Sequence, residues 1–349
     1  MDVTRFRLLQ LPQNAFFNVL RSMHTVEVVL LSLISKKSAA LVKSVNFECR
    51  HSCVQIRSST ITVKINMFGE TMDYVDFEFM YLRSPQCDVN QLHSTKLCTS
   101  EYNQRHPAVN HQMPRQFESL HFWMNHLKFL FNFTKVKSIW FGDSQFDYQS
   151  IRRTFPTFDF LSIESDVSLE NNRQILTTFP IVKNLTIENH AYQESKFPDH
   201  VLFGNYDQLS IGDSSDHETL LKLDDILQMN GKEISIGNIT LSEKELNRLL
   251  KLWSKGAWPR LEKMELFTIM AAGTRELNKD VIFKGMRYQS FPLEHEQQHV
   301  LSTGGTELVD GGFGIFRKDG TRATVTLSQV EEDFNFSLYV WHPHCIGET

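Results

Sequence analysis

The 349-residue sequence has little of what marks a secreted, membrane-spanning or nucleic-acid-binding protein. An odd number of scattered cysteines fits reduced thiols and argues against a disulfide-built fold. Basic residues (36) do not outnumber acidic ones (41), so no basic surface for nucleic acid or an anionic membrane is expected. The longest apolar run, residues 26–34, is too short for a membrane helix of about 20 residues. The five cysteines are Cys49, Cys53, Cys87, Cys98 and Cys345.

No signal peptide is expected, because the first residues lack a basic segment followed by an apolar stretch. Hydrophobic residues make up 41% of the chain and aromatic residues 11%, enough for a packed core. These observations predict a globular protein of the cytoplasm or nucleus, long enough for about two domains.

The first predicted helix follows Leu11-Pro12, where proline suits the first turn of a helix because it needs no amide partner there. Apolar residues at Phe16, Val19, Leu20 and Met23 then recur at i, i+3, i+4 and i+7. This spacing predicts an amphipathic helix with one buried stripe.

Two more helices are predicted, at 26–33 and around 39–42, with Thr25 as the N-cap of the second helix and Glu27 in its first turn. The second helix is apolar on nearly all sides, so every face must be covered. Three helices in about 40 residues cannot bury that surface alone. The segment therefore predicts a docking module with a protein partner, the alternative being a helical cap on the next domain.

After residue 44 the apolar period changes to two. Residues 60–67 and 75–81 alternate apolar and polar side chains, which predicts two paired strands with one buried face. Residues 83–115 are polar and contain three prolines, which predicts a long irregular loop.

A short motif then recurs, with its first apolar residue at positions 139, 161, 185, 209, 234 and 264. Leucine-rich repeats have a period of roughly 20–29 residues, with a strand and a helix or turn in each unit. The pattern predicts a βα solenoid, and an ordinary doubly wound α/β domain is the alternative. Helices are expected between the strands at 145–154, 169–178, 216–229 and 242–255, the last one opening with a Ser242/Glu245 capping box.

The C-terminal part predicts a β-hairpin, in which 311–317 pairs with 322–327 around the turn Lys318-Asp319-Gly320. Residues 334–341 form a third strand. The glycine-rich run 311–314 is interpreted as the beginning of a strand, and the tail His342-Pro343-His344-Cys345 as frayed.

The chain resembles nematode F-box proteins with a type 2 F-box-associated domain. The resemblance rests on the F-box-like run in residues 8–44, the strand 60–65, the segments 252–256 and 258–262, and the tail 316–325. It covers nearly the whole length and implies four parts: an F-box (1–45), a strand pair with a polar loop (46–115), an F-box-associated βα repeat region (116–285), and C-terminal strands with a tail (286–349).

The resemblance implies a substrate-recognition subunit of an SCF-type cullin–RING ubiquitin ligase, which is not itself an enzyme. Its partners would be a Skp-type adaptor, a cullin and an unidentified protein substrate, with no nucleic acid, membrane, metal or cofactor. The residues expected to contact the adaptor are Leu11, Pro12, Phe16, Val19, Leu20, Leu31, Ser35, Lys36 and Lys37.

Two other functions follow from particular residues. Many F-boxes carry an aromatic residue where Ser38 stands, which suggests a protein-binding scaffold outside any ligase. His295-Glu296-Gln297-Gln298-His299 matches H-E-x-x-H, the helical motif of zinc hydrolases in which both histidines bind zinc and Glu296 would activate water. The alternative interpretation of this segment is a solvated polar turn, because Pro292 and Gly304-Gly305 leave room for only a short helix.

Overall fold

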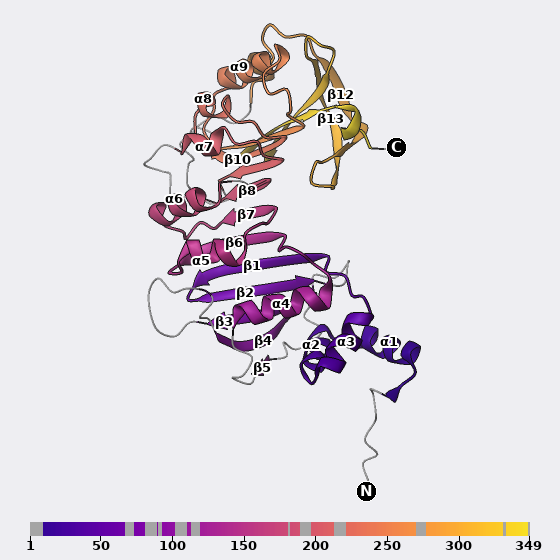
Figure 1. Cartoon of the computed structure of the whole chain (residues 1–349). Coiled ribbons are helices and arrows are strands. Elements are labelled where there is room, and N and C mark those ends of the chain that lie inside the picture. Colours follow the sequence, from indigo (N-terminus) through magenta and orange to yellow (C-terminus); the bar gives the residue numbers. More distant parts are fainter. Residues whose placement is uncertain are drawn as a thin grey trace. The chain divides into compact units, whose positions relative to one another are not determined.

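The structure is a computed structural model that divides the chain into two compact units, Met1–Asp159 and Phe160–Thr349 (Figure 1). Among the described residues no helix is long and apolar enough to cross a membrane. The four-part division of the chain remains a prediction. The described residues are 10–66, 73–80, 89, 93–101, 110–112, 119–180, 182–188, 197–212, 221–269, 277–330 and 333–347.

The first unit begins with three helices: α1 (Gln13–Ser22), α2 (Thr25–Leu33) and α3 (Lys36–Ser44), which confirms the predicted three-helix start. The predicted cap of α2 is wrong by one residue. His24 is the N-cap, its backbone N–H donates to Glu27 Oε2 at 3.1 Å, and Thr25 is buried in the first turn. The side chain of Glu27, which was predicted to lie in this first turn, thus completes the capping box.

Helix α3 opens with a second capping box, between Ser35 and Ser38. The Ser35 N–H donates to Ser38 Oγ (2.9 Å) and the Ser38 N–H donates to Ser35 Oγ (3.1 Å). Ser38 is fully buried. Ser38, which stands where many F-boxes have an aromatic residue, therefore accepts a hydrogen bond from the backbone N–H of Ser35 at the start of α3.

Helix α4 (Leu120–Phe131) was not predicted, although its pattern is clear in retrospect. Ser119 caps it through the Phe122 N–H, and Asn132 ends it in a left-handed conformation (φ 54°). The Asn132 side chain then donates to Asn46 Oδ1 (2.9 Å) and to the Phe47 carbonyl (3.2 Å), just after α3. The buried residues of α4 follow helical spacing: Leu120, Trp123, Met124, Leu127, Leu130 and Phe131.

The sheet of this unit has the order β6-β1-β2-β3-β4-β5, in which β1 and β6 are parallel and the other neighbours are antiparallel. The predicted pairing of β2 with β3 is confirmed. The prediction of a loop throughout 83–115 is wrong, because β4 and β5 lie within it. Helix α5 (Tyr148–Thr154) follows β6. The strands are β1 (His51–Ser58), β2 (Thr60–Asn66), β3 (Asp73–Met80), β4 (His93–Glu101), β5 (Asn110–Gln112) and β6 (Ser138–Ser144).

The second unit contains five parallel strands: β7 (Phe160–Ile163), β8 (Asn184–Ile187), β9 (Gln208–Ile211), β10 (Glu233–Ile239) and β11 (Lys263–Ile269). Their pairing aligns the predicted repeat residues in one buried row. The leucine-rich-repeat-like solenoid remains a prediction. The row consists of Leu161, Leu185, Leu209, Ile234 and Met264.

Helices α6, α7 and α8 lie along one side of these strands in Figure 1. The predicted helix 169–178 is confirmed as α6, and 242–255 is confirmed as α9 with its Ser242/Glu245 capping box. The prediction at 216–229 is wrong in extent, because among the described residues only α8 is helical there. The helices are α6 (Leu169–Thr178), α7 (Asp199–Leu202), α8 (Leu223–Ile226), α9 (Glu243–Ser254) and α10 (Lys279–Ile282).

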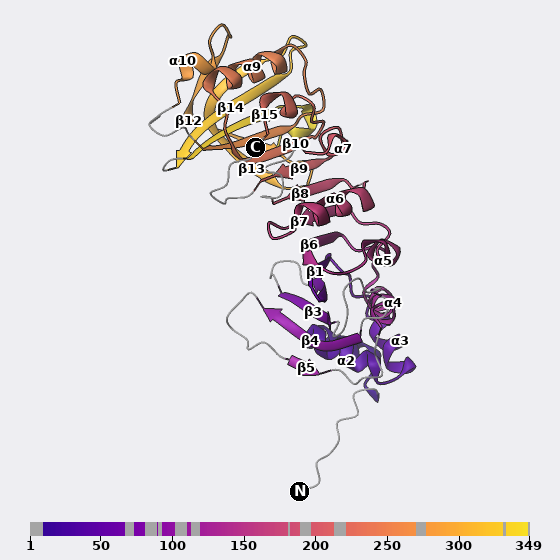
Figure 2. The ribbon, with the colours of Figure 1, turned by 90° about the vertical axis from the view of Figure 1, so that its left-hand side faces the viewer.

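An antiparallel end follows, in the order β12-β13-β14-β15-β11, and Figure 2 labels β12 to β15. The predicted hairpin and third strand are confirmed. The prediction that residues 311–314 begin a strand is wrong, because they lie inside β13. Gly312 has φ +102°, and an added Cβ would lie 2.6 Å from the Val325 carbonyl oxygen. The strands are β12 (Gln289–Val300), β13 (Thr306–Phe316), β14 (Arg322–Val330) and β15 (Asp333–Val340).

The C-terminal tail is ordered, which contradicts the predicted fraying. Residues Pro343–Cys345 form a 3-10 turn, η3, and Cys345 is fully buried. His342 Nε2 lies 3.0 Å from the Leu261 carbonyl oxygen, and the Gly347 N–H donates to the Gln298 carbonyl (3.0 Å). These contacts hold the tail against β11 and β12 through both a side chain and the backbone.

We expect Leu209→Ala to lower the free energy of unfolding of the second unit by about 2–5 kcal/mol, because the truncation leaves a cavity in the aligned row. Denaturant unfolding followed by circular dichroism measures this change. Ser210→Ala, the next residue on the opposite face of β9, should change it by less than about 0.5 kcal/mol. Equal effects of the two substitutions would contradict the burial of this row.

Candidate functional site

Three of the residues predicted to contact a partner lie inside the helical module. Phe16 is 3% exposed, Leu20 is 0% exposed and Leu31 is 9% exposed. Their side chains pack in the interior of the module, so their part in any interface would be to hold its helices in shape. The helical spacing of Phe16 and Leu20 marks a buried stripe whether the cover comes from the same chain or from another, and Leu31 belongs to the helix that is apolar on nearly all sides.

The other predicted contact residues are at least partly exposed. Pro12, Ser35, Lys36 and Lys37 are exposed, while Leu11 and Val19 are half-buried. Ile34, which the sequence reasoning missed, is 70% exposed. It lies between the last residue of α2 and the N-cap of α3. We use the name docking face for a candidate set of exposed and half-buried residues of this module, namely Leu11, Pro12, Val19, Ile34, Lys36 and Lys37.

The module is tied to α4 by polar contacts as well as by packing. Ser32 Oγ, on α2, lies 2.8 Å from His126 Nε2, and Ser32 also donates to the Val29 carbonyl (2.6 Å). The His126 ring stacks on Phe122 with centroids 5.7 Å apart. Burial disfavours the charged imidazole and lowers the pKa of His126. Near the end of α3, the Lys43 ammonium donates a hydrogen bond to Oδ1 of Asn132, the residue that ends α4. The docking face is therefore anchored to the rest of the first unit.

A second candidate site is a pocket of about 190 Å³ in the second unit. Its floor is the face of β9, β10 and β11 that lies opposite the buried row, and residues of the β12–β13 hairpin close one side. Because side chains alternate along a strand, the residues between the buried ones line this face. The lining consists of Gln208, Ser210, Glu233, Ser235, Lys263 and Glu265 from this face, Ile234 from the buried row, and Leu301, Thr303 and Glu307 from the hairpin.

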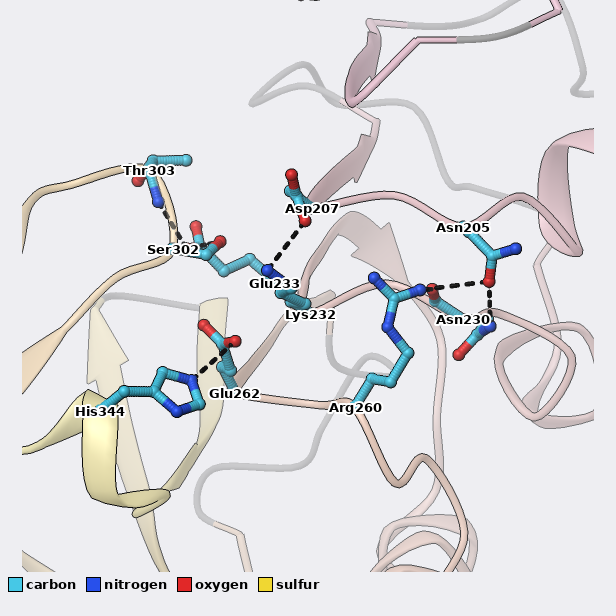
Figure 3. A network of polar contacts seen from close by, with 10 residues as sticks. All are labelled: Asn205, Asp207, Asn230, Lys232, Glu233, Arg260, Glu262, Ser302, Thr303 and His344. Atoms are coloured by element: carbon cyan, nitrogen blue, oxygen red, sulfur yellow. Dashed lines mark hydrogen bonds and ion pairs between the residues drawn. The ribbon is translucent and has the colours of Figure 1, made fainter.

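The pocket is acidic. Lys263 Nζ lies 3.0 Å from Glu265 and 2.6 Å from Glu307, and its side chain is only 9% exposed. Glu233 accepts hydrogen bonds from Ser302 Oγ (2.6 Å) and the Thr303 N–H (3.3 Å), which hold the hairpin turn over the sheet (Figure 3). Three carboxylates against one ammonium leave an excess of two negative charges on the lining.

A polar network continues from the pocket along the strand beginnings (Figure 3). Lys232 Nζ contacts Asp207 at 3.0 Å, and this partner raises the pKa of the lysine. Arg260 donates to Asn205 Oδ1 at 3.1 Å. On the other side of Glu233, His344 Nε2 lies 3.0 Å from Glu262 Oε1. Side chains from the segments that lead into three successive parallel strands, and from the tail, are thus brought into one region.

The H-E-x-x-H segment is neither the helix of a zinc hydrolase nor the solvated turn considered as its alternative, because it lies in strand β12. Residues four apart in a strand are roughly 13 Å apart, too far for two imidazoles to share one ion. His299 is fully buried with Nε2 3.1 Å from the Val340 carbonyl, and His295 stacks on Phe291. The zinc hydrolase predicted at His295, Glu296 and His299 is therefore wrong.

Comparison with known families identifies two segments. The model of the F-box domain matches residues 8–50, and the model described as F-box associated matches residues 197–266. The first match covers the three helices and the docking face. The second covers α7 to the middle of β11, including most of the strand floor of the pocket. No solved structure matches the chain.

A relative of similar length is the F-box associated domain-containing protein sdz-33 of Caenorhabditis elegans. It is 23% identical over 343 residues, which cover 98% of this chain and 100% of the relative. The resemblance to nematode F-box proteins with a type 2 F-box-associated domain is therefore confirmed.

We expect acidification to weaken the first unit through His126. Its pKa is lower in the folded than in the unfolded state, so the unfolded chain binds the proton first. The contribution is fully present above the unfolded pKa of about 6.5 and is lost as pH falls below it towards the folded pKa. Urea unfolding at about pH 7.5 and pH 5.5 measures the loss.

The substitution His126→Gln should reduce this pH dependence. His121→Gln is the matched control, since His121 is exposed on the same helix and should leave the dependence as it is in the wild type. An unchanged pH dependence in His126→Gln would show that other groups cause the loss.

Proposed function

We propose that the chain is the substrate-recognition subunit of an SCF-type cullin–RING ubiquitin ligase. In this proposal the docking face binds a Skp-type adaptor, which connects the chain to a cullin in the cytoplasm or nucleus. The chain contributes binding and positioning rather than catalysis. The observation that carries the proposal is the exposed Ile34 on a helical module that matches the F-box domain model.

Apolar surface remains exposed at the end of α2. Most residues of α2 are buried, yet Ile34 directly after the helix lies in solvent, close in sequence to the exposed Lys36 and Lys37. An aliphatic anchor at the centre of a protein interface, with charges around it, is a common hot-spot arrangement. Pro12 and Leu11 extend the same kind of surface at the start of α1.

We further propose that the acidic pocket on β9–β11 contributes to substrate binding. The leucine-rich-repeat-like interpretation supports this use, because parallel βα units present one row of side chains per strand on a common face. With its excess of carboxylates, the pocket suits a lysine or arginine side chain of an extended substrate segment. Under this proposal the substrate is characterised only by a basic side chain in the bound segment.

The other candidate function is a protein-binding scaffold outside a ligase, suggested by Ser38. The buried capping role of Ser38 argues against this, because the residue maintains α3 rather than leaving a gap on the docking face. The same binding experiment separates the two functions.

We expect Ile34→Glu to weaken binding to a purified Skp-type adaptor by about 2 kcal/mol or more, roughly thirtyfold, because a charge would replace a buried anchor. Calorimetric titration of the full chain measures the dissociation constant. Leu11→Ala combined with Pro12→Ala tests the part of the proposed contact that precedes α1.

The matched control is Leu293→Glu, which changes an aliphatic residue of similar exposure (75%) on β12. It should bind the adaptor as the wild type does. If Ile34→Glu also binds normally while wild type and control bind, the docking face is assigned wrongly. If the wild type binds no adaptor and no cullin co-purifies, the scaffold function is favoured.

For the pocket, we expect Ser235→Arg to reduce recovery of substrates at least about tenfold in affinity purification with the proteasome blocked. The introduced guanidinium would occupy the cavity and pair with its carboxylates. Adaptor recovery should be unchanged, because the docking face lies in the other unit.

Thr186→Arg is the control for the pocket. Thr186 lies on β8 in register with Ser210, on the same face but outside the pocket lining. Equal substrate recovery with Ser235→Arg and with Thr186→Arg would place substrate binding elsewhere.

A further inference from the structure

Three ligand-type side chains meet where the C-terminal turn packs against the beginning of β11. Glu262 immediately precedes β11, and His344 and Cys345 belong to η3. One nitrogen, one sulfur and one carboxylate oxygen of these residues all lie within 4.8 Å of one another. Figure 3 shows the His344 ring directed at the Glu262 carboxylate, 3.0 Å from its Oε1. Residues more than 80 positions apart in the sequence are therefore brought together by the fold.

The carboxylate is buried but only partly satisfied. The Glu262 side chain is 4% exposed, and its Oε2 is buried with no hydrogen-bond partner in the described part of the chain. An unsatisfied buried acceptor on a charged group is costly. Cys345, a free and fully buried thiol, adds a second group that becomes anionic on binding a metal. A cation at this point would satisfy both groups.

We propose that Glu262, His344 and Cys345 bind one Zn²⁺ ion. Zinc accepts thiolate, imidazole and carboxylate ligands at distances of about 2.0–2.3 Å in tetrahedral geometry, which places ligand atoms about 3.3–3.7 Å apart. The cluster needs only small side-chain rotations to reach that spacing. The fourth position is open to water, because the His344 side chain is 66% exposed.

The mixed ligand set selects among metals. Calcium and magnesium require oxygen ligands, of which this cluster supplies only one carboxylate. Thiolate together with imidazole favours zinc among abundant divalent ions in a reducing compartment. On binding, the Cys345 thiol loses its proton to solvent, and the Sγ–Zn bond replaces the S–H bond.

The neighbouring histidines do not complete the cluster. His342 stacks on His344 at 5.6 Å between centroids, but its Nε2 is engaged by the Leu261 carbonyl. His299 Nε2 is engaged by the Val340 carbonyl. Bound zinc would pin the C-terminal turn to β11 beside the acidic pocket. The proposal does not depend on the function of the docking face.

The test uses the purified full chain in reducing buffer, loaded with Zn²⁺ and dialysed against metal-free buffer. We expect about one retained zinc per chain by elemental analysis, and competition with a chromophoric chelator gives the dissociation constant. His344→Ala and Glu262→Gln should each weaken binding by at least about tenfold, since even the loss of a residue supporting a ligand commonly does so. His344 is exposed, so its substitution tests the site without disturbing the core.

Cobalt substitution identifies the sulfur ligand. Co²⁺ bound by the wild type should show a thiolate-to-metal charge-transfer band that Cys345→Ser lacks. Cys53→Ser, a buried cysteine of β1, and His200→Ala, an exposed histidine of α7, are the matched controls and should bind as the wild type does. No retained zinc in the wild type, or retention in His344→Ala and Cys345→Ser as high as in the wild type, would overturn the proposal.

Discussion

The burial of α2 is the constraint on which the first unit depends. A helix that is apolar on nearly every side cannot remain in water, and two neighbouring short helices are too small to cover it. Helix α3 and strand β4 contact α2, and the Ser32–His126 hydrogen bond joins α2 to α4. Ile34, which follows the last residue of α2, remains exposed. The surface proposed to bind an adaptor is therefore the part of this apolar segment that its own unit leaves in solvent.

In the second unit the corresponding constraint is the two-residue period of the strands. In-register pairing directs one row of side chains, such as Leu209 and Ile234, into the core beneath the helices. The intervening row, which includes Glu233 and Lys263, must face away from it. The β12–β13 hairpin then folds over that polar row and converts a flat surface into a pocket. Packing on one face of the sheet thus leaves room for polar recognition on the other.

Sequence reasoning failed where a local pattern has more than one structural solution. H-E-x-x-H suits a helix or a turn when considered alone, but long-range pairing with β13 places it in a strand. The polar segment 83–115 resembles a loop, yet β3 provides an edge to which β4 can pair. The tail was expected to fray because its partners, Leu261 and Glu262, are about 80 residues distant. In each case the deciding contact is remote in sequence.

The three N-terminal helices, the aligned strand repeat, helix α9 and the C-terminal hairpin could be predicted from local sequence patterns, because periodicity, caps and turn residues act over a few neighbouring positions. The family resemblance was also visible in these local patterns. Which apolar residues stay exposed depends on the tertiary structure, as Ile34 is exposed and Leu31 is buried. The tertiary structure alone assembled the acidic pocket and the Glu262–His344–Cys345 cluster. Burial and proximity depend on how distant segments pack, and no local pattern specifies that.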